Sequence, residues 1–302
     1  MTNNLVFDIK RFAINDGPGI RMAIFFKGCP LSCTWCHNPE SMSPSIQKLY
    51  SKSKCIGALK CIEICPNNAL ELTKTGIVTN FENCNLCGKC VEVCPTKAME
   101  FSGYKKSVDE LIIEIEKERL FFEQSGGGVT FSGGEPMLHT DFLLKILKEC
   151  EVRGIHRVID TSAHCSMSSL LKVAKHTNLF LIDLKIMNSV KHQLYTGVTN
   201  QKILKNITEL AKTDVEIIFR LPLIKGVNLN EENIIATAIF INSLQGNRNK
   251  INLLPFHNTA TVKHEKLGKS ISLKGMEKPT ESELKKVVSI FNQYKIKATV
   301  GG

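Results

Sequence analysis

Three closely spaced cysteines are the most chemically specific feature of the sequence. Cys29, Cys33 and Cys36 follow an apolar segment in the pattern C-x3-C-x2-C. Iron-sulfur clusters ordinarily take four cysteine ligands, so three thiolates predict a 4Fe-4S cluster with one iron left open for a small ligand. A zinc site that lacks its fourth ligand is the alternative.

A glycine-rich motif further along the chain favours the cluster. Gly133 and Gly134 follow an apolar segment and let the backbone approach a ligand closely. Glu135 could accept a hydrogen bond from an amino group. The motif alone is also compatible with a simple turn, and zinc would leave it unexplained. Together the two motifs predict a site for S-adenosylmethionine, whose amino and carboxylate groups fit the open iron.

A second group of cysteines predicts a small metal-dependent module over residues 50–103. Seven of the twelve cysteines belong to it: Cys55, Cys61, Cys65, Cys84, Cys87, Cys90 and Cys94. The second half reads C-x2-C-x2-C-x3-C-P, in which the fourth cysteine of each half ligates the other half's cluster. Cys65 should therefore complete a 4Fe-4S cluster with Cys84, Cys87 and Cys90.

The first half of the module departs from this pattern. Ala58 stands where its second cysteine is expected, which leaves Cys55, Cys61 and Cys94 for the other cluster. That cluster could be 4Fe-4S with another fourth ligand, 3Fe-4S, or absent. The clusters could pass electrons to the Cys29 loop, or they could only staple a module too short to fold without metal.

The rest of the chain predicts an α/β fold that positions these motifs. Short apolar segments read as buried strands at residues 22–28, 127–134, 157–162, 179–185, 215–223 and 251–256. Helical periods lie between them, at 108–124, 139–154 and 200–213. The alternation predicts a partial (β/α)6, TIM-like barrel over residues 1–49 and 104–302, interrupted by the inserted ferredoxin-like module.

Reactive residues of such barrels lie at the carboxyl ends of the strands. Asp160 and Thr161, Asp183 and Lys185, Arg220, and His257 fall at the ends of successive predicted strands. S-adenosylmethionine carries both charge signs, and Glu135, Asp183, Lys185 and Arg220 supply both at the predicted barrel mouth. Asp183 and Lys185 could instead be a surface pair, and His257 a simple rim residue.

Several motifs together resemble the activating enzymes of glycyl radical enzymes, in the radical S-adenosylmethionine superfamily. The resemblance covers nearly the whole chain and is carried by D-G-P-G-I-R at 16–21, C-H-N-P-E at 36–40, S-G-G-E-P at 132–136, D-L-K at 183–185, Y-T-G-V-T-N at 195–200 and L-L-P-F-H at 253–257. Many members carry a two-cluster insert like residues 50–103.

The resemblance implies reductive cleavage of S-adenosylmethionine to a 5′-deoxyadenosyl radical, which takes hydrogen from a backbone glycine of a partner enzyme. The contacts that it implies are Trp35, Cys36, His37, Gly133, Gly134, Glu135, Asp183, Leu184, Lys185, Arg220 and His257. It further implies a monovalent cation near Asp160 and Thr161. Asp16 and Arg21 either order the partner's glycine loop or close the barrel. The partner could be a dehydratase of hydroxyproline or of a diol, a choline lyase or an arylacetate decarboxylase, and a dehydratase is slightly favoured.

Composition places few limits on partners. The sequence has 43 % hydrophobic residues, no long apolar run and a formal charge of +10 from scattered lysines and arginines. We expect a cytoplasmic protein that binds neither membrane nor nucleic acid and receives electrons from a flavodoxin or ferredoxin. Cys150 and Cys165 lie outside both motifs, and neither has the spacing of a ligand. Cys150 falls on a helical apolar stripe and is expected in the core, whereas Cys165 is expected in a loop near the predicted site.

The main rival function is an iron-sulfur electron carrier without radical chemistry. Such a carrier has no need for an open cluster iron beside a glycine motif. A radical enzyme acting on nucleic acid is a second rival, which the net charge favours, but the sequence has no aromatic and basic stripe of the kind that binds single strands.

Overall fold

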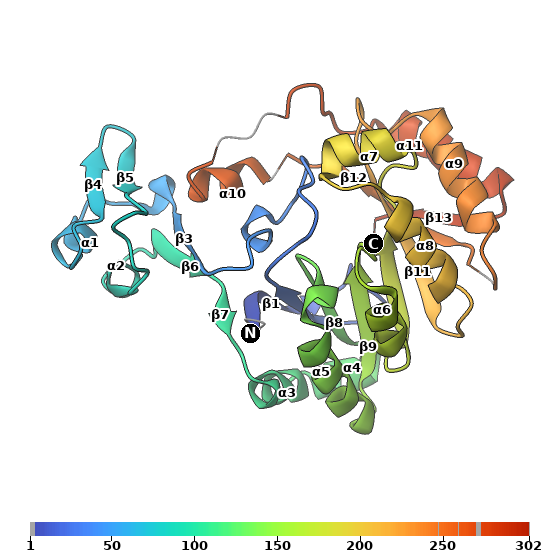
Figure 1. Ribbon diagram of the computed structural model, residues 1–302, viewed down its shortest axis with the longest axis horizontal. Coiled ribbons are helices and arrows are strands. Elements are labelled where there is room, and N and C mark those ends of the chain that lie inside the picture. The colour runs from blue at the N-terminus through green and yellow to red at the C-terminus, as the bar shows by residue number, and fades with distance from the viewer. Residues whose placement is uncertain (1–3, 247, 259, 270–272, 302) are drawn as a thin grey trace.

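The computed structural model describes residues 4–246, 248–258, 260–269 and 273–301. Its main body is a nine-stranded sheet in the order β13-β12-β11-β10-β9-β8-β2-β1-β7 (Figure 1). The strands are β1 Leu5–Ala13, β2 Arg21–Phe26, β7 Tyr104–Lys105, β8 Gly128–Gly133, β9 His156–Thr161, β10 Leu179–Asp183, β11 Glu216–Leu223, β12 Lys250–Pro255 and β13 Lys297–Val300.

The six strands predicted from apolar segments form the middle of this sheet. β2, β8, β9, β10, β11 and β12 lie side by side in chain order and pair in parallel. They are rich in buried Ile, Leu, Val and Phe, as is typical of the strands of a parallel sheet. The predicted α/β fold with a parallel sheet is confirmed.

Three strands of the sheet were not predicted. β1 pairs antiparallel with β2 and has two register shifts, and Phe12 has a φ of 56° near its end. These irregularities obscure the alternation that marks a strand in sequence. β13 extends the parallel part beyond β12, and the two-residue β7 pairs with β1.

Helices connect the parallel strands. They are α3 Val108–Glu116, α4 Arg119–Ser125, α5 Thr140–Val152, α6 Met167–Ala174, α7 Ser189–Thr196, α8 Gln201–Leu210, α9 Glu231–Asn242, α10 Ala260–Lys266 and α11 Glu281–Gln293. The predicted single helix at 108–124 is wrong, because the chain leaves helical geometry around Glu118 and α4 starts anew. The other two predicted helices are present as α5 and α8.

The cysteine-rich segment forms a lobe that extends from the main body at the left of Figure 1. It contains α1 Lys60–Glu63, α2 Lys89–Glu92 and the antiparallel pairs β3 Gln47–Tyr50 with β6 Met99–Ser102 and β4 Leu70–Thr73 with β5 Gly76–Thr79. Its small core includes Leu70, Ile77 and Met99. β3 begins before the predicted boundary at residue 50, and the division into domains stays a prediction.

A buried lysine joins the lobe to the sheet. Lys27 follows β2, and its Nζ donates to the Glu40 carbonyl at 2.6 Å, to Gln47 Oε1 at 3.0 Å and to Ser102 Oγ at 3.3 Å. Burial lowers the pKa of Lys27 to about 8. The three acceptors come from the loop after β2, from β3 and from β6, so one side chain connects all three segments.

Within the described residues, no helix is both long and apolar enough to cross a membrane. Cys150 is buried in the main hydrophobic core, as predicted, and Cys165 is buried there too, in the loop after β9.

Arg21 closes the amino-terminal end of the sheet. Its fully buried guanidinium donates to Thr130 Oγ1 and the Val129 carbonyl, both at 2.7 Å, and to the Pro18 carbonyl at 2.9 Å. These contacts hold the 16–21 turn against β8. Of the two roles considered for Arg21, the geometry supports closing the barrel.

We expect Arg21→Met to lower the free energy of unfolding by about 3 kcal/mol, because it leaves buried acceptors without donors. Lys286→Met is the matched control. Lys286 forms an ion pair with Glu231 in which both side chains are exposed, so its loss should cost less than about 1 kcal/mol. Urea denaturation of both variants measures the difference, and equal losses would contradict the role given to Arg21.

Candidate functional site

A cavity of about 500 Å³ opens at the carboxyl ends of the parallel strands. The predicted site residues that line it are Cys29, Cys33, Trp35, Cys36, His37, Gly133, Gly134, Asp160, Thr161, Asp183, Lys185, Arg220 and His257. They come from segments far apart in the sequence, and parallel pairing brings the strand ends to one edge. Glu135 and Leu184 are not among the lining residues.

The three cysteines lie on an irregular loop after β2. Burial raises the pKa of Cys29 and Cys33, and raises that of Cys36 to about 12. Neutral thiols are therefore favoured until a metal replaces their protons. Trp35 is buried against Ile186, Ile224, Val227 and Phe256.

The Y-T-G-V-T-N motif clamps this loop. The Ser32 amide donates to the Thr196 carbonyl at 2.8 Å, and the Thr34 amide donates to the Tyr195 carbonyl at 3.0 Å. Gly197 has a φ of 82°, and a Cβ there would collide with the Ser32 hydroxyl. The motif thus fixes the backbone on which the cysteines are spaced.

Both glycines of the S-G-G-E-P motif are required by neighbouring backbone. A Cβ on Gly133 would meet the backbone of Phe26, and one on Gly134 would meet the carbonyl of Gly28. Gly133 also has a φ of 114°, in the region that favours glycine. The close packing joins β8 to the start of the cysteine loop, so glycine is needed here even without a ligand.

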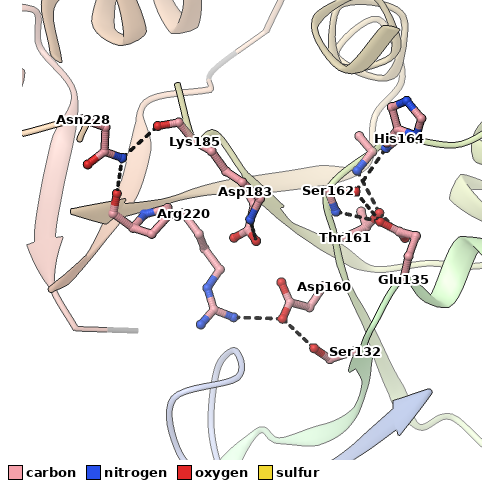
Figure 2. A network of polar contacts seen from close by, with 12 residues as sticks. Ser132, Glu135, Asp160, Thr161, Ser162, His164, Asp183, Lys185, Arg220 and Asn228 are labelled. Atoms are coloured by element: carbon pink, nitrogen blue, oxygen red, sulfur yellow. Dashed lines mark hydrogen bonds and ion pairs between the residues drawn. The ribbon is translucent and has the colours of Figure 1, made fainter. Parts of the chain in front are cut away.

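Glu135 follows the cavity-lining Gly134 and is completely buried. Its carboxylate accepts hydrogen bonds from Thr161 Oγ1 at 2.6 Å, from the Ser162 amide at 2.9 Å and from Ser162 Oγ at 2.5 Å (Figure 2). It also accepts from the Met137 amide at 3.2 Å. Burial raises the pKa of Glu135, while these hydrogen bonds lower it. The carboxylate ties the end of β8 to the end of β9.

Asp183 and Lys185 form an ion pair at the end of β10, with Nζ to Oδ2 at 2.7 Å. Burial lowers the pKa of Lys185, but the Asp183 carboxylate raises it by more, so Lys185 stays protonated. Its side chain is 10 % exposed, and that of Asp183 is 27 % exposed. A cation is therefore held beside the cysteine loop.

A second charged pair crosses the site. Arg220 Nη1 donates to Asp160 Oδ2 at 3.2 Å, and Ser132 Oγ donates to the same oxygen at 2.7 Å (Figure 2). Burial raises the pKa of Asp160 to about 6, with Arg220 opposing the rise. Asp16 lies 3.9 Å from the guanidinium. Arg220 lies inside β11 rather than at its end, but it pairs in register with Asp183.

His37 and His257 lie near each other at the cavity wall. Burial and His257 lower the pKa of His37.

The short helix α10 contacts the end of the cysteine loop. Lys263 Nζ lies 2.8 Å from Glu40 Oε1 and 2.7 Å from Asn38 Oδ1.

The cysteine-rich lobe has two cavities of its own. One is lined by Cys65, Cys84, Cys87 and Cys90, together with Lys48. The other is lined by Cys55, Cys61 and Cys94, together with Ala58. The grouping is the one that the sequence pattern predicts. Within the described ranges, no three His, Cys, Asp or Glu side chains converge tightly enough to hold a single metal ion.

Some site residues were missed or lie differently from the prediction. Leu184 packs into the main core, and its amide donates to the Arg220 carbonyl at 2.8 Å. The supporting roles of Ser132 and Ser162 were not predicted, although Ser132 belongs to the S-G-G-E-P motif and Ser162 directly follows Thr161. Their hydroxyls hold Asp160 and Glu135.

Comparison with known proteins identifies the class. The Radical SAM superfamily model matches residues 23–238. The chain therefore belongs to the radical S-adenosylmethionine superfamily, whose members bind a 4Fe-4S cluster and S-adenosylmethionine. Cys29, Cys33 and Cys36 are the thiol donors that fit the cluster, and the cavity beside them has charges of both signs to fit S-adenosylmethionine.

The relatives narrow the assignment. The chain is 39 % identical to trans-4-hydroxy-L-proline dehydratase activating enzyme of Clostridioides difficile, covering 99 % of this chain and 100 % of that one. It is also 39 % identical to (2S)-3-sulfopropanediol dehydratase activating enzyme of Klebsiella oxytoca, over 98 % and 96 %. The chain belongs to the family of glycyl radical enzyme activating enzymes.

A solved structure agrees with the sequence relatives. A domain of pyruvate-formate lyase-activating enzyme from Bacteroides vulgatus is 41 % identical, with a TM-score of 0.51. It aligns with 58 % of this chain and 99 % of its own.

The clamp on the cysteine loop yields a test. We expect Gly197→Ala to slow 5′-deoxyadenosine formation roughly tenfold or more, because its Cβ displaces Ser32 between two cluster cysteines. Gly154→Ala is the matched control, since Gly154 also has a positive φ, of 67°, but open space around it. Nucleoside release from the reduced, iron-loaded proteins is measured. Equal rates for both variants would contradict the clamp.

Proposed function

We propose that this chain activates a dehydratase of the glycyl radical class. The observation that carries the proposal is the cavity in which three cysteines, the Asp183–Lys185 pair and the Asp160–Arg220 pair meet. The choice of a dehydratase rests on the two relatives whose printed names give a dehydratase, both 39 % identical over nearly the full length.

Cys29, Cys33 and Cys36 would hold a 4Fe-4S cluster, which would supply the electron that cleaves S-adenosylmethionine to methionine and a 5′-deoxyadenosyl radical. That radical would take a hydrogen atom from the backbone glycine of the partner.

This chain's residues orient the substrate. Lys185 and Arg220 are buried cations that would balance its carboxylate, and Asp183 an anion for its ammonium group. Trp35 fills the apolar wall beside Phe256, which excludes water from the site. His37 and His257 line the same cavity and would contact the adenosine portion.

Of the predicted contacts, Glu135 has a supporting role in this proposal. Glu135 accepts four hydrogen bonds from other residues, and so acts by fixing the glycine turn beneath the substrate. The monovalent cation at Asp160 and Thr161 stays a prediction, since Arg220 already pairs with Asp160 and the Thr161 hydroxyl donates to Glu135.

We further propose that the lobe is a ferredoxin-like module that carries electrons to the Cys29 loop. Cys65, Cys84, Cys87 and Cys90 would bind a 4Fe-4S cluster in their shared cavity. A flavodoxin or ferredoxin would be the external donor, and the net charge of +10 suits an acidic one.

Lys48 supports an anionic occupant in that cavity. Its side chain lines the four-cysteine cavity, the residue is only 5 % exposed, and its Nζ has no hydrogen-bond partner among the described residues. A buried and unpaired ammonium is costly. A negatively charged cluster beside it would remove that cost.

The partner is tested by mixing the iron-loaded, reduced protein with S-adenosylmethionine and either candidate dehydratase under anaerobic conditions. We expect a glycyl radical signal in the electron paramagnetic resonance (EPR) spectrum of a dehydratase, and none with Cys33→Ala, which lacks a cluster ligand. Nucleoside without a radical on either protein would refute the dehydratase partners. No nucleoside at all would favour the electron carrier.

The role of Lys48 is tested through the reduction potential of the adjacent cluster. We expect Lys48→Met to lower that potential, because the reduced cluster carries more negative charge and loses a nearby cation. Lys48→Arg should restore most of it. Exposed Lys74→Met serves as the control for the loss of one positive charge in the lobe. A redox titration followed by EPR measures the shift, and an unchanged potential in Lys48→Met contradicts the prediction.

A further inference from the structure

The two halves of the cysteine-rich lobe repeat each other in sequence. Cys55 corresponds to Cys84, Cys61 to Cys90 and Cys65 to Cys94, at a constant spacing along the chain. In this alignment Ala58 corresponds to Cys87.

The backbone repeats as well. α1 corresponds to α2, and residues with a positive φ occur at matching positions of the two halves. They are Gly57 and Leu86, Leu59 and Gly88, and Asn68 and Lys97. The amide of Ala69 donates to Cys65 Sγ at 3.3 Å, and that of Ala98 donates to Cys94 Sγ at 3.2 Å. Ala58 therefore lies at the backbone position that Cys87 has in the other half, and the loop around it keeps the same conformation.

Leu59 shows that this conformation is retained against a local cost. Its φ is 56°, where the matching residue of the other half is Gly88. A left-handed residue other than glycine is strained. The second half has the same strain at Leu86, where the first half has Gly57. The first half therefore keeps the loop shape of a cluster site although its second cysteine is missing.

The cavity at Ala58 offers three thiols and no fourth anionic ligand among its lining residues. The other polar side chains there are Lys60 and Thr96. A lysine ammonium has no lone pair to give. Thr96 Oγ1 lies 3.9 Å from Cys94 Sγ, with which it is paired. Ala58 itself is exposed, so an iron at that corner would face solvent.

We propose that this cavity holds a 3Fe-4S cluster bound by Cys55, Cys61 and Cys94, in which the iron corner that faces Ala58 is missing. The inference rests on the accessory clusters of the proposed function and adds that they are unequal. Each iron of the three-iron cluster has one thiolate, so every thiol in the cavity is used.

The test uses the full chain carrying Cys29→Ser, Cys33→Ser and Cys36→Ser, because the barrel site also has only three thiolates and could give the same signal. The protein is loaded anaerobically with iron and sulfide and then mildly oxidised. We expect about seven irons per chain and the EPR signal of an oxidised 3Fe-4S cluster at about one spin per chain. Adding Ala58→Cys should abolish the signal and raise iron to about eight.

Lys74→Cys is the matched control, because it adds an exposed cysteine to the lobe outside both cavities, and it should keep the signal. About four irons without the signal would show the Ala58 cavity to be empty, and about eight without it would reveal a fourth ligand. Either result overturns the inference and leaves the four-cysteine cluster standing. A lobe without iron would refute the accessory clusters themselves.

Discussion

The structure depends on holding three thiols at fixed spacing on a loop that has no regular secondary structure. Such a loop cannot satisfy its own backbone groups, so its neighbours do so. The Tyr195–Thr196 segment accepts hydrogen bonds from its amides, Gly133 and Gly134 pack against its start, and Lys263 contacts its end. Motifs that look like separate ligand sites in the sequence are therefore partly a scaffold for one loop.

Charge imposes the second constraint. A buried charge is tolerated when it is paired and hydrogen-bonded. The site has two such pairs, Asp183 with Lys185 and Asp160 with Arg220, and Ser132 completes the second. These pairs keep both signs ready at the strand ends before any substrate arrives. The site is thus preorganised for a ligand that carries an ammonium and a carboxylate.

The lobe combines a repeated backbone with unequal chemistry. One cavity has four cysteines and a buried lysine, and the other has three cysteines and an alanine. Because the loops have the same shape, the difference between the sites lies in side chains alone. Lys27 connects this lobe to the end of β2, next to the Cys29 loop.

The sequence by itself determined the chemistry and most of the frame. Cysteine spacing gave the ligand groups, and the buried apolar segments gave the six central strands, because both signals are local. Tertiary structure decided which residues do which work. Only packing shows that Arg21 closes the sheet, that Glu135 is enclosed by Thr161 and Ser162, and that Lys48 faces the four-cysteine cavity. Contacts between residues far apart in the chain produce no regular spacing in the sequence, so they could not be predicted. β1 could not be predicted because its register shifts remove the alternation of a regular strand.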